Sequence, residues 1–237
     1  MRMFGFVASI LLFCAPVTRG DGIVYRLPAD GASVQYDMVI KLRPPGAAVD
    51  IEIKGSIRLS SVGVETVAEE KCRWIEFRTE LRPDGQVQTI LTKALIPEKH
   101  LGRGKNPIDH VVRAWHKAGD MEVMPLTDLK SAQASILQTL LVGPDPNTIK
   151  LDPITIDNAK LGKLECAGER ATRDLEFGNT KSKTTFENRL SDKVPFGVLK
   201  SVLKFQNDQG GTPIEGELTL DLTDVGETAL TELPNNK

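Results

Sequence analysis

The chain has 237 residues, of which 40% are hydrophobic and 26% are charged, and its formal net charge is −2. This is the composition of an ordinary folded protein, and it excludes collagen-like, low-complexity and disordered chains. The near balance of 30 basic and 32 acidic residues also argues against nucleic acid as a partner, because nucleic-acid-binding proteins usually present an excess of Lys and Arg.

The first 20 residues are typical of a secretion signal. A weakly basic start is followed by the apolar run Phe4–Ala15, which is shorter than the roughly 20 residues that a membrane-spanning helix needs. Thr18 and Gly20 are small residues, as expected before a cleavage site. We therefore expect residues 1–20 to be a signal peptide. The mature chain is expected to be periplasmic or extracellular, without a transmembrane segment.

The sequence has three cysteines, whose expected state depends on export to an oxidising compartment. Cys14 leaves a lipid anchor open as an alternative, although Phe13 stands where a lipoprotein signal has a small residue. Removal of the signal leaves Cys72 and Cys166, which can form one disulfide in an oxidising compartment or remain two buried thiols. No Cys-x-x-Cys pair occurs, which argues against a zinc ribbon.

Apolar and polar residues alternate along four segments in the first half of the mature chain. A period of two is typical of strands that have one face in the core and one in water. The expected strands cover residues 34–42, 51–59, 64–80 and 86–95, and Pro83–Gly85 is a turn signal between the last two.

The spacing changes near residues 106–142, where two central helices are expected. Asn106 and Pro107 form a typical helix start. The first helix would place apolar residues at helical spacing at Ile108, Val111, Val112 and Trp115. The second would begin at Thr127 or Asp128 and carry Leu129, Ile136, Leu137, Leu140 and Leu141.

Five further strands are expected in the second half of the chain, at residues 154–157, 163–177, 182–190, 197–206 and 214–223. The order of strands, helices and strands predicts a mainly β (α+β) fold. It is a curved antiparallel sheet, or incomplete β-barrel, with the two helices packed against it. We expect one domain over 21–225, followed by a polar tail over 226–237.

No motif indicates an enzyme. The sequence lacks HExxH, GxSxG and the phosphate-binding GxxxxGK[ST], so no residue is assigned a catalytic role and no metal or cofactor is expected. The three histidines, His100, His110 and His116, are expected at the surface.

Two tryptophans are the best candidates for lining a pocket. Trp74 lies two residues from Cys72 in an expected strand, and therefore on the same face. Trp115 completes the apolar stripe of the first expected helix. Core packing explains both residues, whereas a more specific interpretation places Trp74 and Trp115 in the wall of an apolar pocket between sheet and helices.

Two stretches carry a resemblance. The segment Asn188–Lys200 with the alternating Ser201–Phe205 run, and the earlier Ala94–Lys99, resemble small exported bacterial proteins of unknown function. In outline these proteins are similar to the lipoprotein-carrier (LolA-like) fold, an incomplete antiparallel barrel with helices at its open side. The resemblance implies that the barrel holds acyl chains, and no functional residue of that family maps onto this sequence.

The sequence thus favours an exported, non-enzymatic protein that binds a lipid or another hydrophobic small molecule in a groove between sheet and helices. A first alternative is an envelope or extracellular structural protein with a filled core, whose partner is another envelope protein. A second alternative is a hydrolase whose site is assembled in space from scattered residues. A large apolar cavity, an external binding patch or a cleft of titratable groups would distinguish the three.

Overall fold

The computed structural model describes residues 22–43, 46, 49–127, 141, 148–177, 180–209 and 212–233. Eleven strands form a single antiparallel sheet among these residues. They are β1 (Ser33–Arg43), β2 (Ile51–Val67), β3 (Glu70–Arg82), β4 (Gln88–Pro97), β5 (Arg113–Ala118), β6 (Met124–Pro125), β7 (Ile149–Asn158), β8 (Gly162–Phe177), β9 (Thr180–Leu190), β10 (Val198–Gln209) and β11 (Thr212–Gly226). Three short 3-10 turns, η1 (Pro83–Gly85), η2 (Glu98–His100) and η3 (Pro107–His110), are the only helical elements in the described part of the chain.

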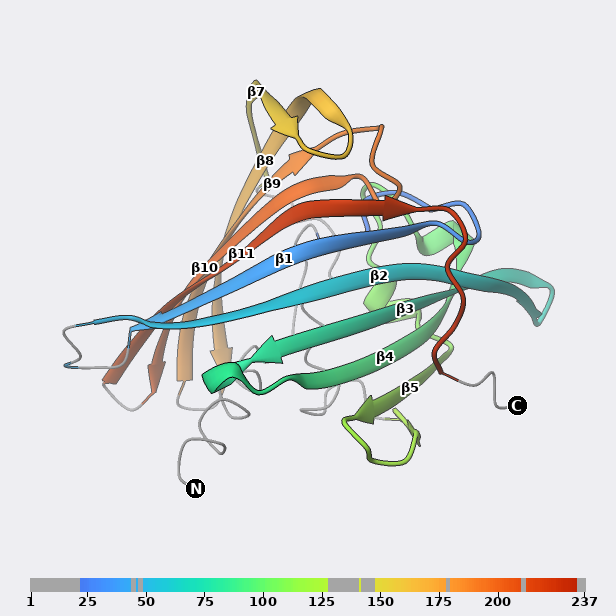
Figure 1. The fold of residues 1–237 in the computed structure, drawn as a ribbon, viewed down its shortest axis with the longest axis horizontal. Helices are drawn as coiled ribbons and strands as arrows, with labels where there is room; N and C mark the ends of the chain where they lie inside the picture. Colours follow the sequence, from blue (N-terminus) through green and yellow to red (C-terminus); the bar gives the residue numbers. More distant parts are fainter. Residues whose placement is uncertain are drawn as a thin grey trace.

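The first and last strands meet in the middle of the sheet. The order is β6-β5-β4-β3-β2-β1-β11-β10-β9-β8-β7, so each half of the chain is a meander and β1 joins the two halves. In their register, Tyr36 lies opposite Leu222 and Met38 lies opposite Leu220. Figure 1 shows β1 and β11 side by side, with β2–β5 bending away on one side and β7–β10 on the other. The predicted mainly β, curled antiparallel sheet is therefore confirmed.

The sheet is curled but open. Strand twist and β-bulges both bend a sheet. Register shifts of this kind occur at Gln35/Tyr36, Ser61/Val64, Val198/Lys200 and Leu151/Ile154. The strands β6 and β7 remain at opposite ends of the sheet, and no pairing joins them among the residues described. The fold is thus an open trough with a concave and a convex face.

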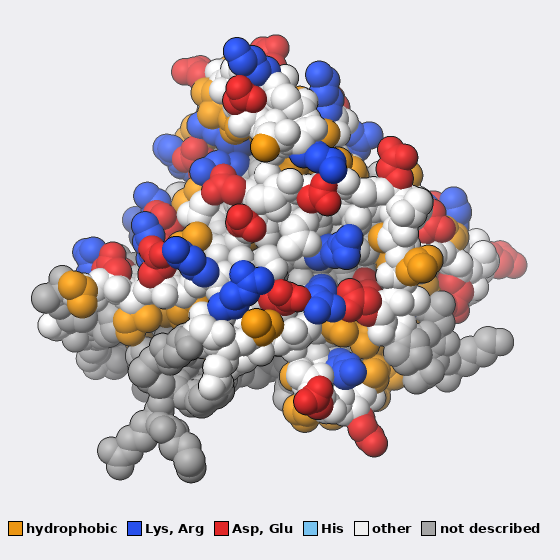
Figure 2. Space-filling model, viewed as in Figure 1, with side chains coloured by type: hydrophobic (Ala, Val, Ile, Leu, Met, Phe, Trp, Pro, Cys, Tyr) orange, Lys and Arg blue, Asp and Glu red, His pale blue; other side chains and the backbone are white. Residues whose placement is uncertain are grey.

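The two faces differ sharply in polarity. Along β1, Val34, Tyr36, Met38, Ile40 and Leu42 are all buried in the main hydrophobic cluster on the concave face. The alternate residues point to the convex face, where Figure 2 shows Lys and Arg side chains mixed with Asp and Glu over most of the surface. The alternation read from the sequence therefore identifies the correct core face of β1.

The helix expected to begin at Asn106 is not formed. Pro107–His110 makes only a 3-10 turn, and Arg113–Ala118 is strand β5, paired with β4. The apolar positions that suggested a helix fit a strand equally well, because Ala114 and His116 alternate with the half-exposed residues around them. Pairing with β4 supplies the backbone hydrogen bonds that a helix would have made internally.

The second expected helix, from Thr127 or Asp128 to Leu141, lies almost wholly outside the described residues; Leu141 is described, and it is buried in the main cluster. The expected signal peptide, residues 1–20, also lies outside them. The described part contains no helix with the length and apolar character that a membrane crossing requires.

Candidate functional site

The concave face of the sheet is an apolar surface built from cross-strand rows. One row joins Leu222, Tyr36 and Ile57, and another joins Leu218, Ile40 and Ile53. All of these side chains except the half-buried Leu218 are buried. Residues that lie opposite each other on antiparallel strands share a face and contact each other, so the rows form a continuous apolar lining across β11, β1 and β2.

Among the residues that the structure describes, irregular segments cover much of this lining. We call residues 22–32, 98–112 and 191–197 the cover segments. Five of their apolar side chains are buried in the main cluster, and these are Ile23, Val24, Leu101, Val194 and Phe196. The first and third segments are joined by the Tyr25 N–H, which donates to the carbonyl of Phe196 at 2.9 Å. Such segments open at lower cost than paired strands do, because they make fewer backbone hydrogen bonds.

A single carboxylate of β8 ties two cover segments to the sheet. Glu169 of β8 is nearly buried, and its Oε1 accepts hydrogen bonds from the Tyr25 hydroxyl at 2.8 Å and from Arg103 Nη2 at 3.0 Å. The Arg103 guanidinium also lies 5.7 Å from the centre of the Tyr25 ring. Glu169 therefore links β8 to the segment before β1 and to the segment after β4.

Glu169 is also one end of a row of buried polar side chains on the concave face of β8, β9 and β10. It lies opposite Asn188 of β9, which in turn lies opposite Ser201 of β10. All three residues are at most 9% exposed. Because a buried polar group costs free energy unless it is hydrogen bonded, this row stands out from the apolar rows beside it.

The sequence carries a signal for two members of this row, Asn188 and Ser201. Asn188 stands two residues from Phe186 and from Leu190, and Ser201 stands two residues from Leu203. Period-two spacing therefore places both polar residues on the core face. Glu169 could not have been found in this way, because β8 changes its buried side beside Gly168: Cys166 is buried but Ala167 is exposed, whereas Glu169 is buried but Arg170 is exposed.

The two tryptophans singled out from the sequence come together, but on the convex face. Trp74 packs with Val62, Cys72 and Leu95 in a second hydrophobic cluster, and Trp115 packs against that cluster. The guanidinium of Arg113 lies 5.5 Å from the centre of the Trp74 ring. With the first helix absent, they do not lie between sheet and helix; a pocket-lining role for them stays a prediction.

A C-terminal strap, which we define as residues 227–233, covers this second cluster. In Figure 1 the strap leaves the end of β11 and runs across β2 and β3 toward β4. The buried Glu76 accepts hydrogen bonds from the backbone N–H groups of Glu232 (2.9 Å) and Leu233 (3.1 Å) and from the Thr231 hydroxyl (2.7 Å). Lys93 donates to the Thr231 hydroxyl oxygen at 2.8 Å and to the Leu233 carbonyl at 3.2 Å. Part of the expected polar tail is thus docked, with Leu233 buried.

The two cysteines of the mature chain are not joined. Cys72 belongs to the convex-face cluster and Cys166 to the main cluster, and both are free. The disulfide that the sequence permitted is therefore not formed in the structure, because the two residues occupy separate clusters. Burial raises the pKa of both thiols, which favours their unreactive form.

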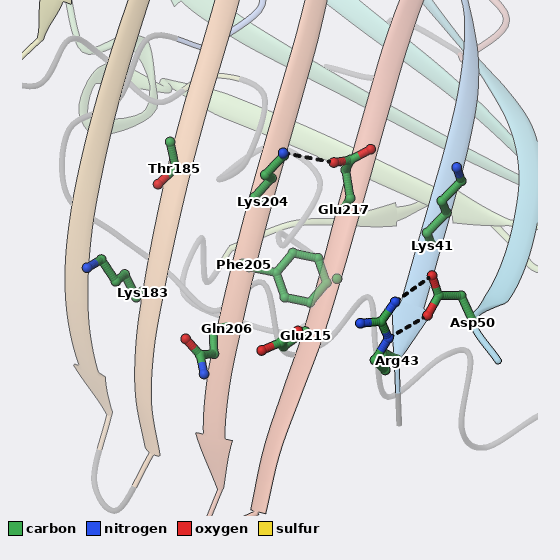
Figure 3. Close-up of a pocket in the computed structure, with 11 residues that line it drawn as sticks. Lys41, Arg43, Asp50, Lys183, Thr185, Lys204, Phe205, Gln206, Glu215 and Glu217 are labelled. Atoms are coloured by element: carbon green, nitrogen blue, oxygen red, sulfur yellow. Dashed lines mark hydrogen bonds and ion pairs between the residues drawn. The ribbon is translucent and has the colours of Figure 1, made fainter. Parts of the chain in front are cut away.

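A pocket of about 580 Å³ lies on the convex face. Two cross-strand rows form its walls, and Figure 3 shows them above and below Phe205: Lys41, Glu217, Lys204 and Thr185 in one, and Arg43, Glu215, Gln206 and Lys183 in the other. Arg43 pairs with Asp50 at 2.7 Å, and Lys204 pairs with Glu217 at 3.4 Å. The walls carry both signs of charge and are mostly exposed, which is typical of a solvated sheet surface.

All three histidines are expected at the surface, and the structure differs from this expectation at His116. The rings of His100 and His110 stack with their centres 3.4 Å apart, whereas His116 is buried on β5, where burial lowers the pKa of its imidazole. The expected surface position of His116 is therefore wrong. Within the described ranges, no group of three His, Cys, Asp or Glu side chains is arranged to hold a metal ion.

No protein-family model matches the chain, and no curated protein matches it at a significant level. Among solved structures, it is similar to an exported protein with a YmcC-like fold from Bacteroides fragilis (8% identity, TM-score 0.35, 85% of this chain and 99% of that one). It is also similar to a DUF1329 family protein from Desulfovibrio piger (11%, 0.32, 86% and 89%) and to a β-barrel-like DUF1849 protein from Brucella abortus (12%, 0.24, 86% and 98%). At this level the likeness says nothing about what this chain binds.

Proposed function

We propose that this is an exported, non-enzymatic protein that holds the apolar part of a lipid, or of another hydrophobic molecule, against the concave face of its sheet. One observation carries the proposal. In the described part of the chain, the apolar rows across β11, β1 and β2 are covered by irregular segments, and no strand pairing closes the sheet. A ligand can replace such segments without breaking the sheet.

The energetics favour an acyl chain as the apolar part. Each methylene group buried from water contributes about 0.8 kcal/mol, so a chain of ordinary length offsets the cost of displacing a few side chains of the cover segments. The cover segments are held on β8 chiefly by the contacts of Glu169 with Tyr25 and Arg103. Other contacts hold the same segments to β2 and β3, among them the Gly31 N–H to the Ser61 carbonyl and the ion pair of Arg73 with Glu98. Opening on the β8 side would leave these contacts in place.

The proposal also states where the protein acts, which is outside the cytoplasm. It rests on the apolar run Phe4–Ala15 and the small residues before Asp21, which are typical of a secretion signal. The periplasm or the exterior would bring the open trough close to membrane lipids.

Binding of the neutral dye Nile red tests the proposal. Leu218, half-buried on the concave face of β11, and Thr219, its neighbour on the convex face, are a matched pair. Replacement of Leu218 by lysine places a charge in the apolar lining and is expected to weaken dye binding at least tenfold. Replacement of Thr219 by lysine is expected to leave binding unchanged, and circular dichroism checks that both variants fold.

Two results would overturn the proposal. The first is a wild-type protein that neither enhances Nile red fluorescence nor carries lipid, by mass spectrometry, after purification without detergent. The second is equal loss of binding in the Leu218 and Thr219 variants. Either result would favour a structural protein with a filled core.

A further inference from the structure

The polar row of the concave face has unused hydrogen-bonding capacity. The two printed contacts of Glu169 both end on its Oε1, and its Oε2 has no partner among the residues that the structure describes. The hydroxyl of Ser201, which is 5% exposed, likewise has none there. Neither atom is among the fully buried side-chain atoms that lack a partner in the described part of the chain, so both remain accessible to solvent or to a ligand. A ligand that lies on the concave face could therefore satisfy both.

The position of the row matches that of a polar head beside an apolar chain. Ser201 lies opposite Leu220, and the next row along the strands contains Phe186, Leu203 and Leu218. Adjacent strands are about 4.8 Å apart, so Glu169 and Ser201 are separated by about 10 Å at the backbone. An apolar chain on the lining would therefore place its head within reach of both side chains.

The hydrogen-bonding groups of the polar row indicate which kind of lipid head would fit beside it. A carboxylate oxygen only accepts hydrogen bonds, so Glu169 Oε2 requires a donor, whereas the Ser201 hydroxyl can donate or accept. A negatively charged head would lie beside the Glu169 carboxylate, and Arg103 is already paired with that carboxylate. Resting on the function proposed above, we infer that the ligand carries a hydroxyl-bearing, uncharged polar head, as in a glycerol monoester, rather than a free carboxylate or phosphate.

Competition between two ligands with the same chain tests this inference. Monoolein and oleate share their acyl chain and differ in the head, and each is titrated against the protein loaded with Nile red at pH 8.5. We expect monoolein to displace the dye with an affinity about tenfold higher than that of oleate, equivalent to about 1.4 kcal/mol.

Three variants refine the test. Glu169→Gln keeps the size and the acceptor oxygen but removes the charge, so the preference for monoolein is expected to fall severalfold. Ser201→Ala is expected to weaken monoolein severalfold and to leave oleate unchanged. Thr219→Val, on the convex face of β11, is the matched control and is expected to change neither affinity.

The outcomes separate the two proposals. If oleate binds as tightly as monoolein or more tightly, or if Glu169→Gln leaves the preference unchanged, the head assignment is overturned while binding to the concave face stands. If neither ligand displaces the dye and the wild type does not bind Nile red, the proposed function itself fails.

Discussion

Replacement of Glu76 by alanine is expected to lower the free energy of unfolding by about 3 kcal/mol and to release the C-terminal strap. The Glu76 carboxylate is 3% exposed and accepts hydrogen bonds from the backbone of Glu232 and Leu233 and from the Thr231 hydroxyl. Hydrogen bonds to a charged group contribute about 1.5–3 kcal/mol each, with losses that are not additive. The buried N–H groups of the strap would lose their acceptor, and Leu233 would leave its buried position.

Urea unfolding and amide hydrogen exchange measure this effect. Exchange over residues 227–233 should accelerate in the Glu76 variant well before the rest of the sheet unfolds. Replacement of Glu232 by alanine is the control, because its side chain forms only a partly exposed ion pair with Arg78, and such pairs contribute about 0–1 kcal/mol. If the Glu232 variant is as unstable as the Glu76 variant, the anchoring role of Glu76 is wrong.

Replacement of Gly55 by alanine is expected to destabilise the sheet by a similar amount, about 3 kcal/mol. A Cβ atom at Gly55 would lie 2.2 Å from the carbonyl oxygen of Glu80 and 2.9 Å from the Cε of Met38. The first neighbour is backbone of the adjacent strand β3, which cannot move aside without disturbing the pairing. Met38 lies opposite Gly55, so the same change also disturbs the concave lining.

Thermal and urea unfolding of the Gly55 variant are compared with those of Ser56→Ala. Ser56 is the next residue of β2 and is also buried, but its replacement removes an atom rather than adding one. We expect the Ser56 variant to lie within about 1 kcal/mol of the wild type. Equal stability of the Gly55 variant and the wild type would show that β2 and β3 are not packed as closely as the structure has them.

The faces of the strands could be predicted from the sequence, because each face is set by neighbours along the chain. The alternation of Tyr36, Met38 and Ile40 with polar residues gave the core face of β1 correctly. The pairing of β1 with β11 could not be found in this way, since its partners lie far apart in the sequence, from Ser33 opposite Gly226 to Arg43 opposite Glu215, and period two says nothing about partners.

The stretch containing β5 shows where local spacing is ambiguous. Val111, Val112 and Trp115 fit a helical stripe, but the Val112 N–H donates to the Leu95 carbonyl and Ala114 lies opposite Ala94. A tertiary partner therefore decided between two local structures that the pattern allowed. The same limit applies to Trp74 and Trp115, whose shared face could be found only once β5 was known to be a strand.

The candidate site could be predicted from the sequence only in part, for the same reason. The apolar lining can be predicted from the alternation of apolar and polar residues. The cover segments have no such period, so the sequence pattern does not indicate them. Ser201 and Asn188 were detectable as polar residues on a core face, but their adjacency to Glu169 depends on the register of β8, β9 and β10.

Photo-crosslinking of a bound lipid tests the central claim most directly. A monoacylglycerol with a diazirine in its acyl chain is bound to the protein, irradiated, and its attachment sites are mapped by peptide mass spectrometry. If the concave face is the binding surface, the labels should fall on Leu203, Phe205 and Leu218, and an excess of unlabelled monoolein should remove them. Labels on the adjoining convex-face residues Val202 and Thr219, or labelling that monoolein does not suppress, would contradict the account.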